Sequence, residues 1–105
     1  MRPRDPEHDP VVRDLRLRIT EADRAVLAAV NRRIELVREL REHKLASGWD
    51  FVDKGREERL LAVLASENPG PLSEAGLRGL FGDLLALTKR ELGDPGATRS
   101  RSPPA

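Results

Sequence analysis

The fold is decided by residues 11–46, VVRDLRLRITEADRAVLAAVNRRIELVRELREHKLA, a stretch that contains neither glycine nor proline. Apolar residues recur along it at alternating intervals of three and four, which is the pattern of an amphipathic helix. The apolar stripe consists of Val12, Leu15, Ile19, Ala22, Val26, Ala29, Leu36 and Leu40. The stretch therefore predicts one helix about 50 Å long, at a rise of about 1.5 Å per residue.

Two cationic side chains lie on this apolar stripe. Arg33 takes a position that calls for an apolar residue, and Lys44, eleven residues further on, returns to nearly the same face. A cation on the buried face of a helix is costly unless an anion meets it. The structural alternatives are an Arg33 that extends to the helix edge and a Lys44 that interacts with the helix dipole. We interpret the pair as lining a pocket for an anion.

Two shorter helices are predicted after the long one. Asp53 is a suitable N-cap for a helix over residues 54–67. The chain then breaks at residues 68–71 (NPGP), and Ser73 is a suitable N-cap for a helix over residues 74–92. No segment has the alternating pattern of a strand. The predicted fold class is therefore all-α, with a long, a short and a medium helix in each chain.

The expected domain organisation is a flexible lead-in over residues 1–10, one helical domain over residues 11–92 and a disordered tail over residues 93–105. The lead-in holds three prolines and several charges, and the tail is polar and proline-rich. A first helix of about 50 Å would project past two shorter helices in a monomer. Because pairing of the long helices would cover it, we expect an intertwined homodimer.

The composition narrows the possible functions. The 19 basic and 18 acidic residues are interleaved and give a net charge of +1, which argues against nucleic-acid binding. The chain has no cysteine, and His8 and His43 do not cluster, which argues against a metal site. No stretch approaches the roughly 20 apolar residues of a membrane span. Since the first ten residues also lack the apolar run of a signal peptide, a cytoplasmic location without membrane association is expected.

Further polar residues could contribute to the pocket. Asp53, Arg56 and Glu57 cluster at the start of the second predicted helix, where acceptors for a hydroxyl lie beside a donor for a carboxylate. Taken singly, these residues also suit a helix cap and a solvated surface pair. Arg16 lies about 100° around the helix axis from Arg33, so one helix does not aim both at one point. The same arginine from a second copy of the chain would complete the pocket.

The combined pattern resembles the all-helical chorismate mutases of the AroQ class. The residues that carry the resemblance are Leu15-Arg16-x-x-Ile19, Asp23, Asn31-Arg32-Arg33, Lys44 and Val52-Asp53-x-x-Arg56-Glu57. From Arg16 through Arg33, Lys44, Asp53 and Arg56 to Glu57 the spacings are 17, 11, 9, 3 and 1 residues, and they fit the family without gaps. The resemblance extends from about Leu15 to Glu91, which is most of the helical part of the chain.

The resemblance implies an intertwined dimer with two active sites, each built mostly by one protomer and completed by one arginine of the other. Arg33 and the partner subunit's Arg16 would hold the carboxylates of the substrate chorismate. Lys44 would meet a carboxylate and the ether oxygen. The implied reaction is the intramolecular rearrangement of chorismate to prephenate, which requires no metal and no cofactor.

The remaining family positions are matched less uniformly. Asp53 and Glu57 would address the ring hydroxyl region, and Arg56 would support a carboxylate. The family usually has serine or another small residue where this chain has Thr88, and glutamine where it has Leu92.

The absent glutamine keeps other interpretations open. The neighbouring Glu91 would replace it if the third helix were shifted by one residue and its carboxyl were protonated; otherwise Lys44 serves the ether oxygen alone. An isochorismate pyruvate lyase on the same fold and a non-catalytic helical dimer are the alternatives to a mutase.

Overall fold

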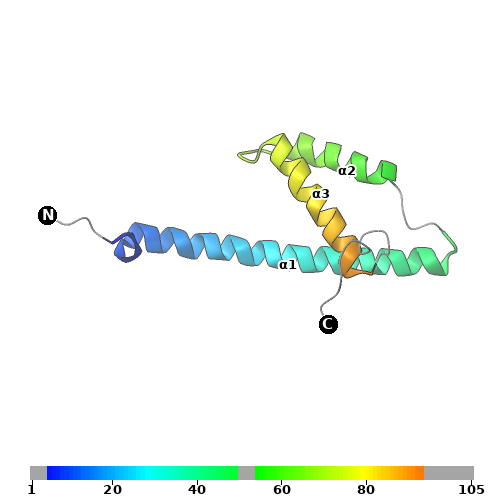
Figure 1. The fold of residues 1–105 in the computed structure, drawn as a ribbon, viewed down its shortest axis with the longest axis horizontal. Coiled ribbons are helices and arrows are strands. Elements are labelled where there is room, and N and C mark those ends of the chain that lie inside the picture. Colours follow the sequence, from blue (N-terminus) through cyan, green and yellow to red (C-terminus); the bar gives the residue numbers. More distant parts are fainter. Residues whose placement is uncertain (1–4, 50–53, 94–105) are drawn as a thin grey trace. The chain divides into compact units, whose positions relative to one another are not determined.

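The computed structural model describes residues 5–49 and 54–93. In chain order its elements are η1 (Pro6–His8), α1 (Pro10–Ala46), α2 (Lys54–Glu67) and α3 (Glu74–Glu91) (Figure 1). Between them these residues form only helices, turns and loops, which confirms the predicted all-α fold with a long, a short and a medium helix. The predicted cap Asp53 and the predicted tail beyond Gly93 lie outside the described residues.

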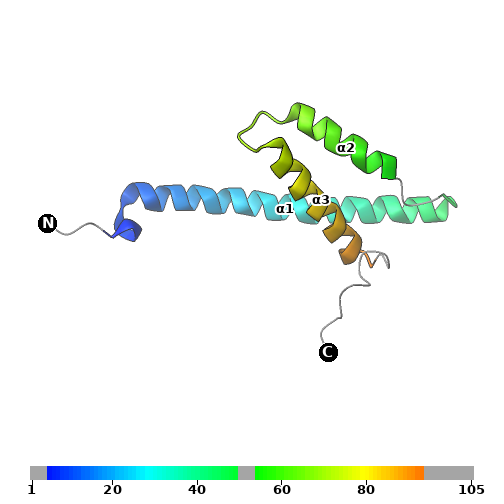
Figure 2. The ribbon, with the colours of Figure 1, turned by 45° about the horizontal axis from the view of Figure 1, so that its top comes forward.

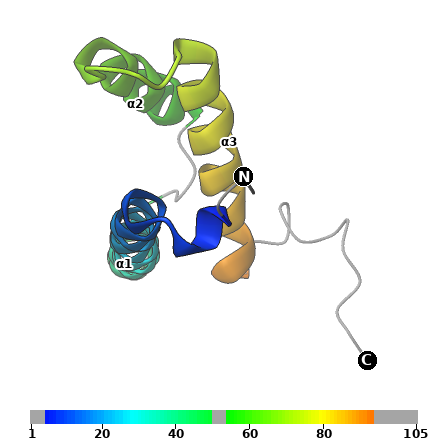
Figure 3. The same cartoon turned by 90° about the vertical axis from the view of Figure 1, so that its left-hand side faces the viewer.

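The chain divides into two compact units, Met1–Arg33 and Ile34–Ala105, and the division falls within α1. In the first unit the short 3-10 turn η1 is set to one side of the α1 axis (Figure 3). The Asp9 carboxylate accepts hydrogen bonds from the N–H groups of Val11 and Val12, at 2.8 and 3.2 Å. These bonds satisfy donors that have no partner within the first turn of a helix, so Asp9 defines where α1 begins.

In the second unit α2 and α3 form a helical hairpin, and the chain reverses in the loop between them (Figure 2). Asn68 organises this loop, because its Nδ2 donates to the Leu72 carbonyl at 2.7 Å and its Oδ1 accepts from the Gly70 N–H at 2.9 Å. The Ser73 hydroxyl oxygen then accepts from the Gly76 N–H at 2.9 Å, which confirms the predicted cap of α3. The loop and the cap are therefore set by local side chains.

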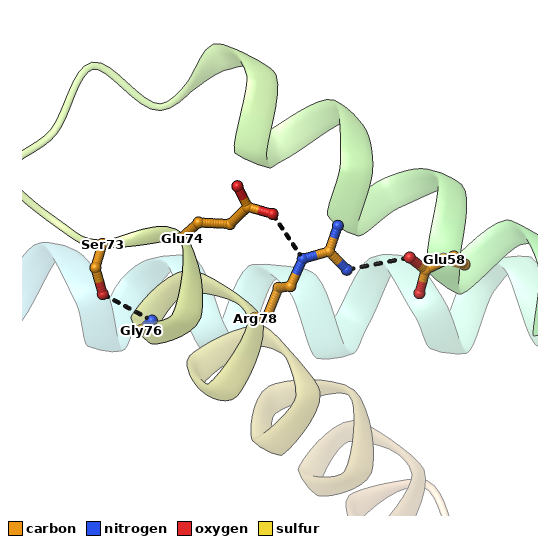
Figure 4. Close-up of polar contacts among 5 residues, drawn as sticks. All are labelled: Glu58, Ser73, Glu74, Gly76 and Arg78. Atoms are coloured by element: carbon orange, nitrogen blue, oxygen red, sulfur yellow. Dashed lines mark hydrogen bonds and ion pairs between the residues drawn. The ribbon is translucent and has the colours of Figure 1, made fainter.

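A bridge of ion pairs joins the two helices of the hairpin (Figure 4). Arg78 of α3 lies 3.1 Å from the Glu58 carboxylate of α2 and 3.2 Å from the Glu74 carboxylate of its own helix. Hydrogen bonds to Glu58 and then to Glu74 raise the pKa of the Arg78 guanidinium above its ordinary value. The bridge thus links α2 to α3 through the side chains of Glu58 and Arg78.

Little apolar surface is buried within the described part of a single chain. Leu77 of α3 is the one buried apolar side chain there, at 4% exposed. No residue of α1 is buried, and its stripe residues Leu15, Ile19 and Val26 are 46%, 59% and 60% exposed. Helices of this kind are stabilised mainly by packing of their apolar face, and continuous exposed apolar surface marks an interaction site. The apolar stripe of α1 is thus largely exposed in the single chain and could pack against another apolar surface.

The described helices include none that combines the length and the apolar character needed to cross a membrane.

The cap of α3 leads to a stability prediction. Replacing Ser73 by alanine is expected to lower the free energy of unfolding by about 1 kcal/mol, because the Gly76 N–H loses its acceptor. Urea denaturation at one fixed protein concentration measures this change. Ser66→Ala is the matched control, since the Ser66 hydroxyl only donates back to the Val63 carbonyl of its own helix. Indistinguishable unfolding midpoints for Ser73→Ala and Ser66→Ala would contradict the role of the cap.

Candidate active site

The side chains predicted to form a site come from all three α-helices. In the first unit, α1 carries Arg16 and Arg33; in the second, the end of α1 carries Lys44, α2 carries Arg56 and Glu57, and α3 carries Thr88. Arg33, Lys44 and Glu57 are half-buried, whereas Arg16 and Arg56 are exposed. Asp53 lies outside the described residues.

In the first unit, Arg16 of α1 pairs with Glu7 of the 3-10 turn η1. Its Nη2 lies 2.9 Å from Glu7 Oε2, and the two side chains are 64% and 57% exposed. Ion pairs this exposed contribute about 0–1 kcal/mol, because solvent screens them and both side chains lose conformational freedom. The guanidinium of Arg16 is therefore accessible and can exchange Glu7 for another anion at little cost.

In the second unit, Glu57 of α2 faces Lys89 of α3. The Glu57 Oε2 and Lys89 Nζ atoms lie 2.9 Å apart, and both side chains are 33% exposed. This separation is that of a close ion pair, and its partial burial reduces screening by solvent. Glu57, one of the predicted site residues, is thus held by a cation from another helix.

Lys89 was absent from the residues predicted from sequence. A lysine in the last turn of a helix is ordinary, because it complements the helix dipole there. Its pairing with Glu57 depends on how α2 packs against α3, and the only available signal was that Lys89 follows Thr88 directly.

Thr88 occupies the inner side of α3. Its side chain is 3% exposed, and its hydroxyl donates to the Leu84 carbonyl at 2.8 Å. A hydroxyl that donates to its own helix in this way needs no further acceptor when it is buried. Thr88 therefore presents a small, satisfied side chain next to Lys89, and helps to anchor this turn of α3 in the unit.

The end of α3 is held by an arginine of α1. Arg41 Nη1 donates to the Leu92 carbonyl at 2.7 Å, and Leu92 is the C-cap residue of α3. A cation that meets the last carbonyls of a helix satisfies them and complements the dipole. Because Arg41 and Lys44 are three residues apart on α1, they are neighbours on the helix surface. The end of α3 is thus brought to the turn of α1 that carries Lys44.

The structure shows how Leu92, which stands where the family usually has glutamine, and its neighbour Glu91 are placed at the end of α3. Leu92 is half-buried, whereas Glu91, the last residue of α3, is exposed. A shift by one residue that would turn Glu91 inward is not seen.

Comparison with known proteins places these residues in one family. The family model for chorismate mutase type II matches residues 15–91. The match includes α2, α3 and all but the beginning of α1, and it contains every predicted site residue from Arg16 to Thr88. No curated protein and no solved structure matches the chain.

Proposed function

Since this chain belongs to the chorismate mutase type II family, we propose that it converts chorismate to prephenate. The family match over residues 15–91 is the observation that carries the proposal. The matched region holds the cations that a dianionic substrate needs, in the order and spacing on which the sequence resemblance was based. No metal ion and no cofactor enters the proposed reaction.

The proposed reaction is an intramolecular pericyclic rearrangement. The C–O bond of the ether breaks while a C–C bond forms, so no nucleophile and no proton transfer are required. The protein must hold the substrate in the compact conformer in which the reacting carbons are close, which converts binding energy into a higher rate. It must also stabilise the negative charge that grows on the ether oxygen as the bond breaks.

Each of these tasks has residues suited to it. Arginine recognises a carboxylate through two parallel N–H donors, so Arg33 and the partner subunit's Arg16 would clamp the two carboxylates. The half-buried Lys44 would place a fixed positive charge at the ether oxygen. Glu57 would accept a hydrogen bond from the ring hydroxyl.

The proposed site requires a homodimer, and the exposed stripe of α1 supports one. Leu36 and Leu40, near the end of the stripe, are 47% and 46% exposed in the single chain, and Leu15, Ile19 and Val26 are exposed to a similar or greater extent. Burying a leucine fully stabilises a protein by about 1.5–3 kcal/mol relative to leaving it exposed. Pairing of two α1 helices along this stripe would therefore be strongly favourable, and we propose that it forms the two shared sites.

The direct test is to follow the loss of chorismate absorbance with the purified protein and to identify the product. Prephenate is the expected product, formed without added metal or cofactor. Isochorismate is offered in parallel, because Leu92 stands where the family usually has glutamine and a lyase would release pyruvate from that substrate. Pyruvate from isochorismate without prephenate from chorismate would replace the mutase with the lyase.

A third outcome would indicate a non-catalytic helical module. A transition-state analogue of the rearrangement should raise the melting temperature of an active enzyme, because a ligand that binds only the folded state stabilises it. No turnover of either substrate, together with no thermal shift by the analogue, would rule out both enzymes.

A further inference from the structure

The Glu57–Lys89 ion pair is partly buried between α2 and α3. Both of its side chains are 33% exposed, whereas the side chains of the Arg18–Asp14 pair are 71% and 65% exposed. Exposed pairs contribute little, but a partly buried pair with a separation of 2.9 Å retains more of its attraction. The pair therefore has the geometry to fix the position and charge of Glu57.

The proposed substrate raises an electrostatic problem that this pair would solve. A dianion is repelled by any carboxylate in its binding site, and the repulsion is strong where solvent is partly excluded. Glu57 is such a carboxylate. A cation in contact with one of its oxygens offsets the charge without removing the acceptor, because a carboxylate has two oxygens. Lys89 occupies Oε2, which leaves Oε1 to accept from a hydroxyl.

The backbone that carries Lys89 is held on both sides. Thr88, the residue before it, is 3% exposed and bonded to the Leu84 carbonyl. Leu92, three residues after it, has its carbonyl bonded to Arg41 of α1. A side chain that starts from a fixed backbone loses less freedom when it forms its ion pair, which favours a lasting contact.

We propose that Lys89 is a positioning residue of the active site. It holds the Glu57 carboxylate in a fixed orientation as an acceptor for the ring hydroxyl, and it offsets the charge with which that carboxylate would repel the dianionic substrate. The inference rests on the proposed function and concerns a residue outside the set predicted from sequence.

The test compares steady-state kinetics on chorismate for the full-length wild type, Lys89→Met and Lys89→Arg. Methionine keeps an unbranched chain of similar length but removes the charge. We expect Lys89→Met to lower kcat/KM about tenfold, chiefly through a higher KM, because a charge-assisted contact at the binding site is lost. Lys89→Arg retains the charge and should recover most of the loss.

The Glu57→Gln background shows whether Lys89 acts through Glu57. Glutamine has no charge to offset, so adding Lys89→Met to Glu57→Gln should change kcat/KM less than about twofold. A similar loss in both backgrounds would overturn the proposal, since Lys89 would then act independently of Glu57.

Glu58→Gln is the matched structural control. Glu58 directly follows Glu57 and pairs with Arg78, so this variant also weakens an ion pair between α2 and α3, but one outside the proposed site. Its KM should equal that of the wild type. If Glu58→Gln raised KM as much as Lys89→Met, or if Lys89→Met left KM unchanged, Lys89 would have no more than a structural role and the proposal would be wrong.

The outcomes separate this inference from the proposed function. Wild-type protein that does not convert chorismate overturns both. If the wild type converts chorismate and both Lys89→Met and Lys89→Arg have wild-type kcat and KM, the proposed role of Lys89 is wrong but the proposed function stands. Circular dichroism and thermal unfolding of each variant establish that the kinetic comparison is made on folded protein; should Lys89→Met not fold, Lys89→Gln takes its place in the same comparison.

Discussion

Replacement of Lys44 by alanine is expected to lower kcat on chorismate at least about 100-fold. The ammonium group is the fixed positive charge proposed to stabilise the ether oxygen as the C–O bond breaks, and loss of one such preorganised group typically costs two to three orders of magnitude in rate. The loss should appear in kcat more than in KM, because the charge on the oxygen develops only in the transition state. Initial rates of chorismate consumption under saturating substrate measure it.

The structure sharpens this expectation for Lys44. Leu92, which stands where the family usually has glutamine, is half-buried and apolar, and its neighbour Glu91 is exposed, so neither residue is placed to share the task. Arg38→Ala is the matched control, because Arg38 is an exposed cation of the same helix and lies off the apolar stripe. It should retain wild-type turnover. A folded Lys44→Ala variant that retained near wild-type turnover would refute the assigned role of Lys44.

Mixing Arg16→Ala with Arg33→Ala protein is expected to restore activity that neither variant has alone. Each proposed site combines Arg33 of one protomer with Arg16 of the other. A mixed dimer therefore contains one site with both arginines and one site with neither. Random exchange at equal concentrations makes half of the dimers mixed, so recovery should reach about a quarter of the wild-type activity per protomer.

The control for this experiment is a mixture of Arg33→Ala and Lys44→Ala protein. Both residues are proposed to come from the same protomer, so every site in the mixed dimer lacks one of them and no activity should return. Subunit exchange is verified by mass spectrometry of differently tagged chains. If exchange occurs and the first mixture stays inactive, the sites are not shared between protomers.

These experiments also probe the exposed state of Arg16. In the single chain its guanidinium pairs with Glu7, at 64% and 57% exposure of the two side chains. Such a pair is weak and easily replaced. The dimer proposed here would give Arg16 a carboxylate partner of the substrate instead, which explains why an arginine would be placed on an otherwise solvated side of α1.

The helices were predictable from sequence because local chemistry sets their ends. The stretch over residues 11–46 has no residue that interrupts a helix, and α1 spans Pro10–Ala46. The Ser73 cap was predicted from its side chain alone and is present. Gly93, which follows the C-cap residue Leu92 of α3, has a φ of +77° that favours glycine. Each of these signals acts within one turn of the helix, so it can be read without knowledge of the fold.

The candidate site was predictable only as a set of residue types at fixed spacings. Its family assignment is confirmed by the match over residues 15–91, whereas the roles of the individual side chains stay predictions until the variants are measured. Lys89 and Arg41 were missed for a common reason. Each is an unexceptional cation on its own helix, and each becomes significant through a partner on another helix, Glu57 and the Leu92 carbonyl.

The three helices, the Ser73 cap of α3 and the placement of Arg33 and Lys44 on the apolar stripe could be predicted from the sequence alone, since periodicity and capping act over three or four residues along one chain. The packing of the helices, in contrast, sets which charges meet across α2 and α3, which residue holds the end of α3, and the burial of Thr88. Contacts between residues tens of positions apart depend on how the helices pack, and the pattern along any single helix carries no record of that packing.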